Sequence, residues 1–112
     1  MVSKYAPRPG HIPGAVINLG GHELVLAPLN LDGVRAAQPY LDRLPELRQP
    51  EEVLQVSAEL LLLSLARNYP DMTAADVAGL LDMDNAPRAI DAMTTQRGYK
   101  RAKPGELTPA SP

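Results

Sequence analysis

The segment from Glu51 to Asn68 restricts the possible folds of this 112-residue chain more than any other. It carries ten apolar residues, among them four successive leucines from Leu60 to Leu63. At 100° per residue, four neighbouring side chains of a helix point over about 300° of its circumference. A helix of this kind is either central and covered by the rest of the chain, or it also forms an interface between subunits. The two alternatives are compatible, and both stay open.

Two β-rich runs precede this helix. Ala15–Leu19 and His22–Leu26 are separated by Gly20-Gly21, and two glycines can both take the positive φ that a two-residue type I′ turn requires. Leu24 and Leu26 share one face of the second run because side chains alternate along a strand. An isolated hairpin is only marginally stable in water, so this one must pack on helices or pair with another chain.

Apolar spacing predicts further helices on both sides of the leucine-rich one. The expected helices span about 31–44, 51–68, 73–82 and 85–97. Pro39 should kink or split the first, because proline removes a helical hydrogen bond. Thr73 and Asp76 resemble a capping box, and Asn85 is expected to cap the last helix. The predicted fold is mainly α (α+β), with an N-terminal β-hairpin packed on a small bundle of about four helices.

Composition divides the chain into one domain and two tails. Residues 15–97 are expected to form a single globular domain, with the hairpin over 15–27. Residues 1–14 and 98–112 are rich in proline and lack periodic apolar positions, so we expect flexible tails. Both ends are net basic, whereas residues 12–97 carry six Arg against twelve Asp and Glu. The folded part should therefore be acidic.

The chemically reactive residues form no catalytic or metal-binding pattern. The chain has no Cys, and His11 and His22 lack partners at metal-ligand spacing. Ser57 and Ser64 lie within the leucine-rich helix without a His in a catalytic pattern. The longest apolar run, Leu60–Leu63, is far too short for a membrane span. We therefore expect no enzyme, no catalytic residue, no cofactor, no metal site and no membrane partner.

The last two expected helices, with the tight joint between them, have the order of a helix-turn-helix. A small helical regulator that binds nucleic acid through this helix-turn-helix-like segment is therefore the alternative function. DNA-binding proteins use positive charge to displace counterions from phosphates, yet residues 70–97 carry five Asp and two Arg. Nucleic acid is for this reason not the expected partner.

A series of short motifs along the chain points to a family. In chain order these are the Gly20-Gly21 hairpin, Leu26-Ala27-Pro28-Leu29-Asn30-Leu31, Gln38-Pro39-Tyr40-Leu41, the leucine-rich helix, Arg67-Asn68-Tyr69-Pro70-Asp71-Met72-Thr73, Val77-Ala78-Gly79-Leu80-Leu81-Asp82 and Asn85-Ala86-Pro87. The ordered set covers residues 15–97 and resembles the tail assembly chaperones of long-tailed bacteriophages and prophages, the lambda-like chaperones of the tape measure protein.

This resemblance implies a non-enzymatic, transient scaffold. Proteins of this family bind the tape measure protein, keep its long apolar helices soluble, and help to recruit tail tube subunits before they leave the finished tail. The implied partners are the tape measure and tail tube proteins, with a homo-oligomer as a further option. The implied location is the bacterial host cytoplasm rather than the mature virion. In many phages a frameshift yields a longer form, and Tyr99–Lys103 is a candidate junction.

The family contributes no catalytic residues, so candidate contacts come from the residues themselves. Exposed apolar surface and an open hairpin edge are both suited to binding other proteins. The candidate protein-binding residues are Leu60, Leu62 and Leu63 on the helix, and Leu24 and Leu26 on the hairpin.

Overall fold

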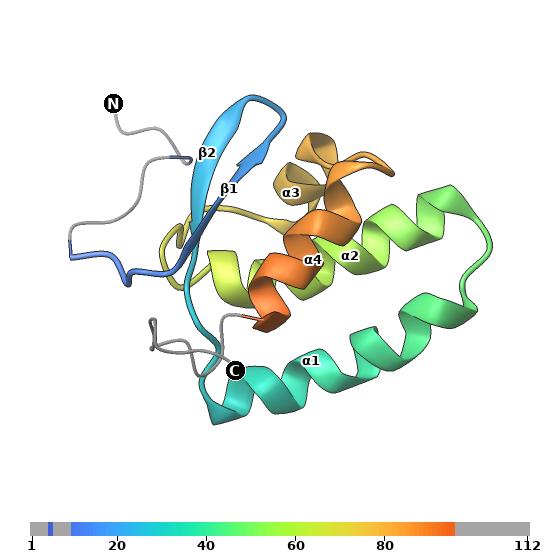
Figure 1. The fold of residues 1–112 in the computed structure, drawn as a ribbon, viewed down its shortest axis with the longest axis horizontal. Coiled ribbons are helices and arrows are strands. Elements are labelled where there is room, and N and C mark those ends of the chain that lie inside the picture. The colour runs from blue at the N-terminus through green and yellow to red at the C-terminus, as the bar shows by residue number, and fades with distance from the viewer. Residues whose placement is uncertain (1–4, 6–9, 96–112) are drawn as a thin grey trace, which may run out of the picture.

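The computed structural model describes Tyr5 and residues 10–95. Its elements are β1 (Ala15–Leu19), β2 (His22–Leu26), α1 (Leu31–Arg43), the 3-10 turn η1 (Leu44–Glu46), α2 (Pro50–Leu65), α3 (Ala74–Leu80) and α4 (Asn85–Thr95). Figure 1 shows the hairpin beside this group of helices. The predicted fold class, an N-terminal hairpin on a small bundle of about four helices, is confirmed.

The hairpin is built on its two glycines. Gly20 and Gly21 have φ of 57° and 87°, and they connect the paired residues Leu19 and His22, as the type I′ prediction requires. A Cβ on Gly20 would lie 3.0 Å from Cδ2 of Leu80. The turn therefore packs closely on the C-terminal end of α3, which favours glycine for space as well as for φ.

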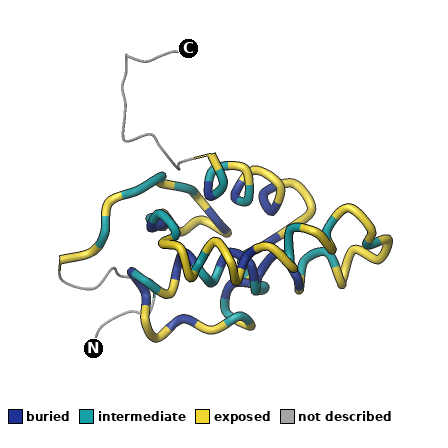
Figure 2. Tube along the Cα trace, turned by 90° about the horizontal axis from the view of Figure 1, so that it is seen from below, coloured by how far each residue is buried: buried dark blue, intermediate teal, exposed yellow. Residues whose placement is uncertain are grey.

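Helix α2 lies at the centre of the molecule. It packs against α1, α3, α4 and β2, and Leu60, Leu61 and Leu65 on it are completely buried. In Figure 2 the buried positions face the middle of the molecule, while outward turns of the helices are exposed. The chain itself thus covers most of the leucine-rich helix, although its C-terminal residue is Leu65 rather than Asn68.

Helix α1 is continuous through Pro39, so of the two predicted effects, a kink or a split, the split is wrong. Asn30 caps its first turn by accepting a hydrogen bond from the Gly33 amide at 2.9 Å. Pro39 is exposed, and the missing amide leaves only one carbonyl, that of Arg35, without its helical donor. Water can hydrate a carbonyl on this outer side, which keeps the disruption small.

The two short C-terminal helices begin with reciprocal side-chain caps. Thr73 and Asp76 form the predicted capping box at the start of α3. The prediction that Asn85 caps α4 is wrong, because Asp82 performs this role. The Asp82 carboxylate accepts from the Asn85 amide at 2.6 Å, and the Asn85 side chain accepts from the Asp82 amide at 2.8 Å. Asn85 thus stands at the N3 position of a capping-box arrangement rather than at its N-cap.

The turn after α2 fastens the N-terminal part of the chain to the helices. Asn68 is fully buried; its Oδ1 accepts from the Ile12 amide at 2.6 Å, and its Nδ2 donates to the carbonyls of Ile12 at 2.8 Å and Val25 at 3.3 Å. The Tyr69 hydroxyl accepts from the Val25 amide at 2.8 Å. The outward-facing backbone groups of β2 at Val25 are therefore already paired with side chains.

These contacts and one ring contact involve residues of the segment that was expected to be a flexible N-terminal tail. Residues 1–14 were expected to be flexible, but Ile12 is fixed through both of its backbone groups. The Tyr5 ring also stacks on His22 with 4.3 Å between the ring centres. The reason is that Asn68 recognises backbone, so no apolar periodicity is needed at residue 12. The rest of the predicted tails, at 1–4, 6–9 and 98–112, lies outside the described residues, as does the predicted end of the last helix.

Candidate functional site

Helices α1 and α4 both pack on α2, and an apolar groove lies between them. One cavity of about 290 Å³ is lined by Pro28, Leu29, Val34, Ala37, Gln38, Leu41, Met93 and Thr94. A second, of about 440 Å³, is lined by Leu44, Pro45, Val53, Ser57, Met83, Ala86, Pro87, Ile90, Asp91 and Thr94. Thr94 lines both cavities, so they adjoin. We call these two sets of residues together the α1–α4 groove.

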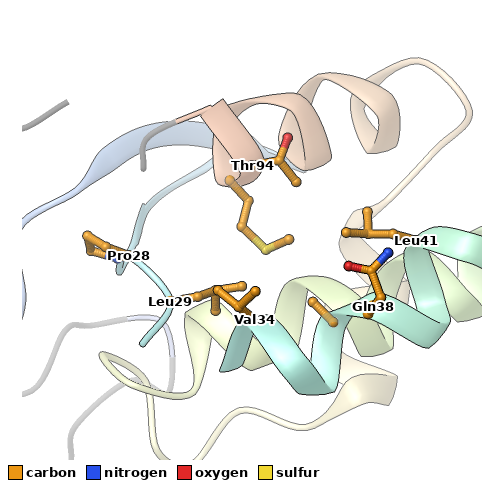
Figure 3. A pocket seen from close by; sticks show the side chains of 8 residues that line it. Pro28, Leu29, Val34, Gln38, Leu41 and Thr94 are labelled. Atoms are coloured by element: carbon orange, nitrogen blue, oxygen red, sulfur yellow. The ribbon is translucent and has the colours of Figure 1, made fainter. Parts of the chain in front are cut away.

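The two walls of the groove come from amphipathic helices. Val34, Ala37 and Leu41 recur at i, i+3 and i+7 along α1, which places them on one face. Figure 3 shows Val34, Gln38 and Leu41 on the α1 side of the first cavity and Thr94 on the α4 side. Each helix uses only part of its apolar stripe against α2, so the remainder lines the gap between them.

Part of this lining is open to solvent. Val34 is 50% exposed and Met83 is 51% exposed, and both belong to the four large apolar side chains that are exposed within the described residues. Scattered apolar side chains on a surface need no explanation, but apolar side chains gathered in a concave site are typical of ligand and protein binding. The α1–α4 groove is therefore the strongest candidate for a functional site in the described part of the chain.

The groove has little charge of its own, and the described part of the chain is acidic as a whole. Asp91 is the one charged residue among the described residues that line it. Across the described residues, five arginines stand against twelve acidic residues. The groove is thus suited to an apolar occupant, and long-range attraction favours an occupant with positive charge near its ends.

One of the residues that line the second cavity carries a buried polar group. Ser57, on α2, is 1% exposed, and its Oγ has no hydrogen-bond partner within the described structure. Ser64, on the same helix and equally buried, donates instead to the Ala27 carbonyl at 2.7 Å. A buried hydroxyl without a partner costs about 1–3 kcal/mol of stability. The packing of the core therefore does not explain why a serine occupies position 57.

These two serines give a matched pair of predictions. Ser57→Ala should raise the free energy of unfolding by about 1 kcal/mol, because it removes an unpaired buried hydroxyl. Ser64→Ala should lower it by about 1–2 kcal/mol, because it leaves the Ala27 carbonyl without its donor. Urea denaturation of both variants measures the difference. Shifts of the same sign would show that Ser57 is paired in solution.

The structure does not bring the five sequence-based candidates together on one surface. Leu24, Leu26 and Leu60 are completely buried in the core, and they present no surface to a partner. Leu62 and Leu63 are half-buried and pack against that core. None of the five lines the α1–α4 groove. The hairpin edge is also less open than expected, because Asn68 and Tyr69 occupy β2 at Val25.

The sequence pattern at the groove residues predicts that they pack inside the fold, but it does not predict a binding site. Val34 and Ile90 belong to the apolar stripes that predict their helices, but a stripe shows which face turns inward and not how much of it is covered. Met83 lies in the joint before α4 and belongs to no stripe. A groove between two helices that are distant in the chain therefore has no local signature.

Two other kinds of site are absent from the described residues. Within Tyr5 and 10–95, no three His, Cys, Asp or Glu residues gather in a way that could hold a metal ion. None of the helices in this part of the chain combines the length and the apolar character that a membrane span requires.

Comparison of the chain with protein-family models, with curated proteins and with solved structures finds no match.

Proposed function

We propose that this protein is a non-enzymatic phage tail assembly chaperone that binds the tape measure protein and helps to recruit tail tube subunits during tail morphogenesis. It acts in the cytoplasm of the bacterial host and is not retained in the mature virion. The ordered motifs over residues 15–97 support this proposal. The observation that carries it is the apolar α1–α4 groove.

The groove provides a physical basis for keeping apolar helices soluble. An amphipathic helix binds by laying its apolar face into a groove of this kind, with anchors at i, i+3, i+4 and i+7. Each partner side chain of leucine size that becomes fully buried contributes about 1.5–3 kcal/mol before the costs of association. A few such anchors give binding that is reversible, as a scaffold that leaves the finished tail requires.

Co-expression tests the proposal directly. The chain is produced together with the tape measure and tail tube proteins encoded beside it, captured through a tag, and the eluate is sized by light scattering. We expect soluble tape measure protein that precipitates when it is produced alone. Failure to retain either partner, with a chain shown to be folded, contradicts the proposal. A salt-dependent shift of labelled duplex DNA would then favour the nucleic-acid-binding regulator instead.

A matched pair of valines locates the contact. Val34→Glu places a carboxylate in the groove and should reduce recovery of tape measure protein at least about tenfold, because a buried unpaired charge is strongly unfavourable. Val16→Glu is the control, since Val16 is 60% exposed and lies on the hairpin, outside the groove. Both variants change half-exposed side chains and should stay folded. Equal losses in the same pull-down would place the contact elsewhere.

A further inference from the structure

We propose that the side-chain amide of Asn68 is a binding site for an extended peptide segment of a partner, and that the chain's own Ile12 occupies it as an autoinhibitory strap. We call residues 10–13 the strap. This site lies outside the α1–α4 groove, so the inference goes beyond the proposed function. Its starting point is a fully buried side chain that binds the backbone of a residue 56 positions away.

The ligand of Asn68 in this structure is an extended polypeptide backbone. Its Oδ1 accepts from the Ile12 amide at 2.6 Å, and its Nδ2 donates to the Ile12 carbonyl at 2.8 Å. A residue directs both groups to the same side when its backbone is extended, as in one pair of an antiparallel ladder, whereas in a helix they point to opposite ends of the axis. Pro13 favours this conformation, because the residue before a proline is biased away from the helical region.

The site is held in place from its other side by the edge of the hairpin. Nδ2 of Asn68 also donates to the Val25 carbonyl at 3.3 Å, and the neighbouring Tyr69 hydroxyl accepts from the Val25 amide at 2.8 Å. These bonds do not involve the strap. A segment that replaces Ile12 therefore meets a donor and an acceptor that are already oriented, which lowers the entropic cost of binding.

The contacts of the strap make it replaceable. Ile12 is half-buried and its neighbours His11 and Pro13 are exposed, so these side chains bury little apolar surface. Segments of this kind open locally without unfolding of the core. The two bonds to Asn68 use backbone groups that every residue except proline has. A partner's extended segment therefore competes with the strap, and its apparent affinity is reduced by the fraction of molecules in which the strap is open.

Synthetic peptides test the site with the full chain and without a partner protein. The probe is a peptide of the chain's own residues 10–16 with both ends capped, and its matched control carries an N-methyl group on the isoleucine amide. Binding is titrated by NMR through the side-chain amide signals of Asn68. The unmodified peptide should bind at least about fivefold more tightly than the control, which is the effect of one lost hydrogen bond.

A variant of the strap tests the autoinhibition. Ile12→Pro deletes the amide that donates to Oδ1 and leaves Asn68 intact. It should tighten binding of the unmodified peptide about fivefold, because the strap is then open in a larger fraction of molecules. His11→Ala is the control, since it changes an exposed strap residue and neither of the two bonds, and it should bind the peptide as the wild type does.

Three outcomes would overturn the inference. These are equal binding of the peptide and its N-methyl control, no gain in affinity from Ile12→Pro, and a dimer of the full chain that dissociates on addition of the peptide. The dimer would assign the site to exchange of straps between two copies rather than to a partner. Because no partner protein is present, a negative result leaves the chaperone proposal unchanged, and a failed co-expression leaves the strap in place.

Discussion

Replacing Asn68 with alanine lowers the free energy of unfolding by about 3 kcal/mol, and urea denaturation measures the loss. The substitution removes three hydrogen bonds and leaves both backbone groups of Ile12 and the carbonyl of Val25 without this partner. Each backbone group stranded away from water costs about 1–3 kcal/mol, and the small cavity left by the side chain adds to the loss. The expected effect is large because one side chain connects three segments of the chain.

Two further variants separate this role from the general effect of removing an asparagine. Asn68→Asp keeps the acceptor for the Ile12 amide but turns a carboxylate toward two carbonyl oxygens, so it should be at least as destabilising. Asn18→Ala is the mild control, because Asn18 is exposed and accepts only from the Gly21 amide at 3.1 Å. Hydrogen exchange at the Ile12 amide should accelerate in Asn68→Ala, which removes the acceptor of this amide. Unchanged protection there would show that Asn68 does not hold the segment in solution.

The second large effect is expected at Leu60. Leu60→Ala should lower the free energy of unfolding by about 3 kcal/mol, the usual cost of a completely buried leucine truncated to alanine. Leu62→Ala, on the same helix but half-buried, should cost about 1 kcal/mol. Thermal and urea unfolding of the two variants gives the comparison. A Leu60→Ala protein that is as stable as the wild type but loses its partner would mean that Leu60 is a contact residue.

Much of the fold is predictable from local sequence signals. Gly20-Gly21 specifies the hairpin and its register, because the turn geometry admits few other residues. The Thr73–Asp76 cap specifies the start of α3. Pro39 left a kink or a split open for α1, and the helix continues through it although proline removes one of its hydrogen bonds. The Asp82–Asn85 pair shows the same limit, because either residue is a good cap and only the backbone decides.

The attachment of the N-terminal segment was not predictable for a different reason. Asn68 binds the amide and carbonyl of Ile12, and every residue except proline has both groups. The identity of residue 12 therefore carries no trace of the contact. The side chain that makes the contact belongs to Asn68, which lies 56 positions away in the sequence. In the sequence, Asn68 indicated only the end of a helix and part of a family motif.

The sequence-based candidates missed the groove because the segment richest in leucine is not the segment whose apolar side chains stay exposed. Leu60 belongs to the densest apolar run of the chain, and this is the reason that the other helices gather over it. The apolar surface that remains open belongs to the weaker stripes of α1 and α4, represented by Val34 and Ile90. Which stripe is left partly uncovered depends on how three helices pack, and no window along the sequence contains all three.

The anchoring of β2 by Tyr69 also sets an order of events during synthesis. The Val25 amide is separated from the Tyr69 hydroxyl by 44 residues, so the hairpin emerges from the ribosome long before its partner exists. At 5–20 residues per second this interval is roughly 2–9 s, far longer than a hairpin needs to form and open again. The apolar face of the hairpin is therefore uncovered during this interval. It becomes covered only after α2 and the turn that follows it have been synthesised.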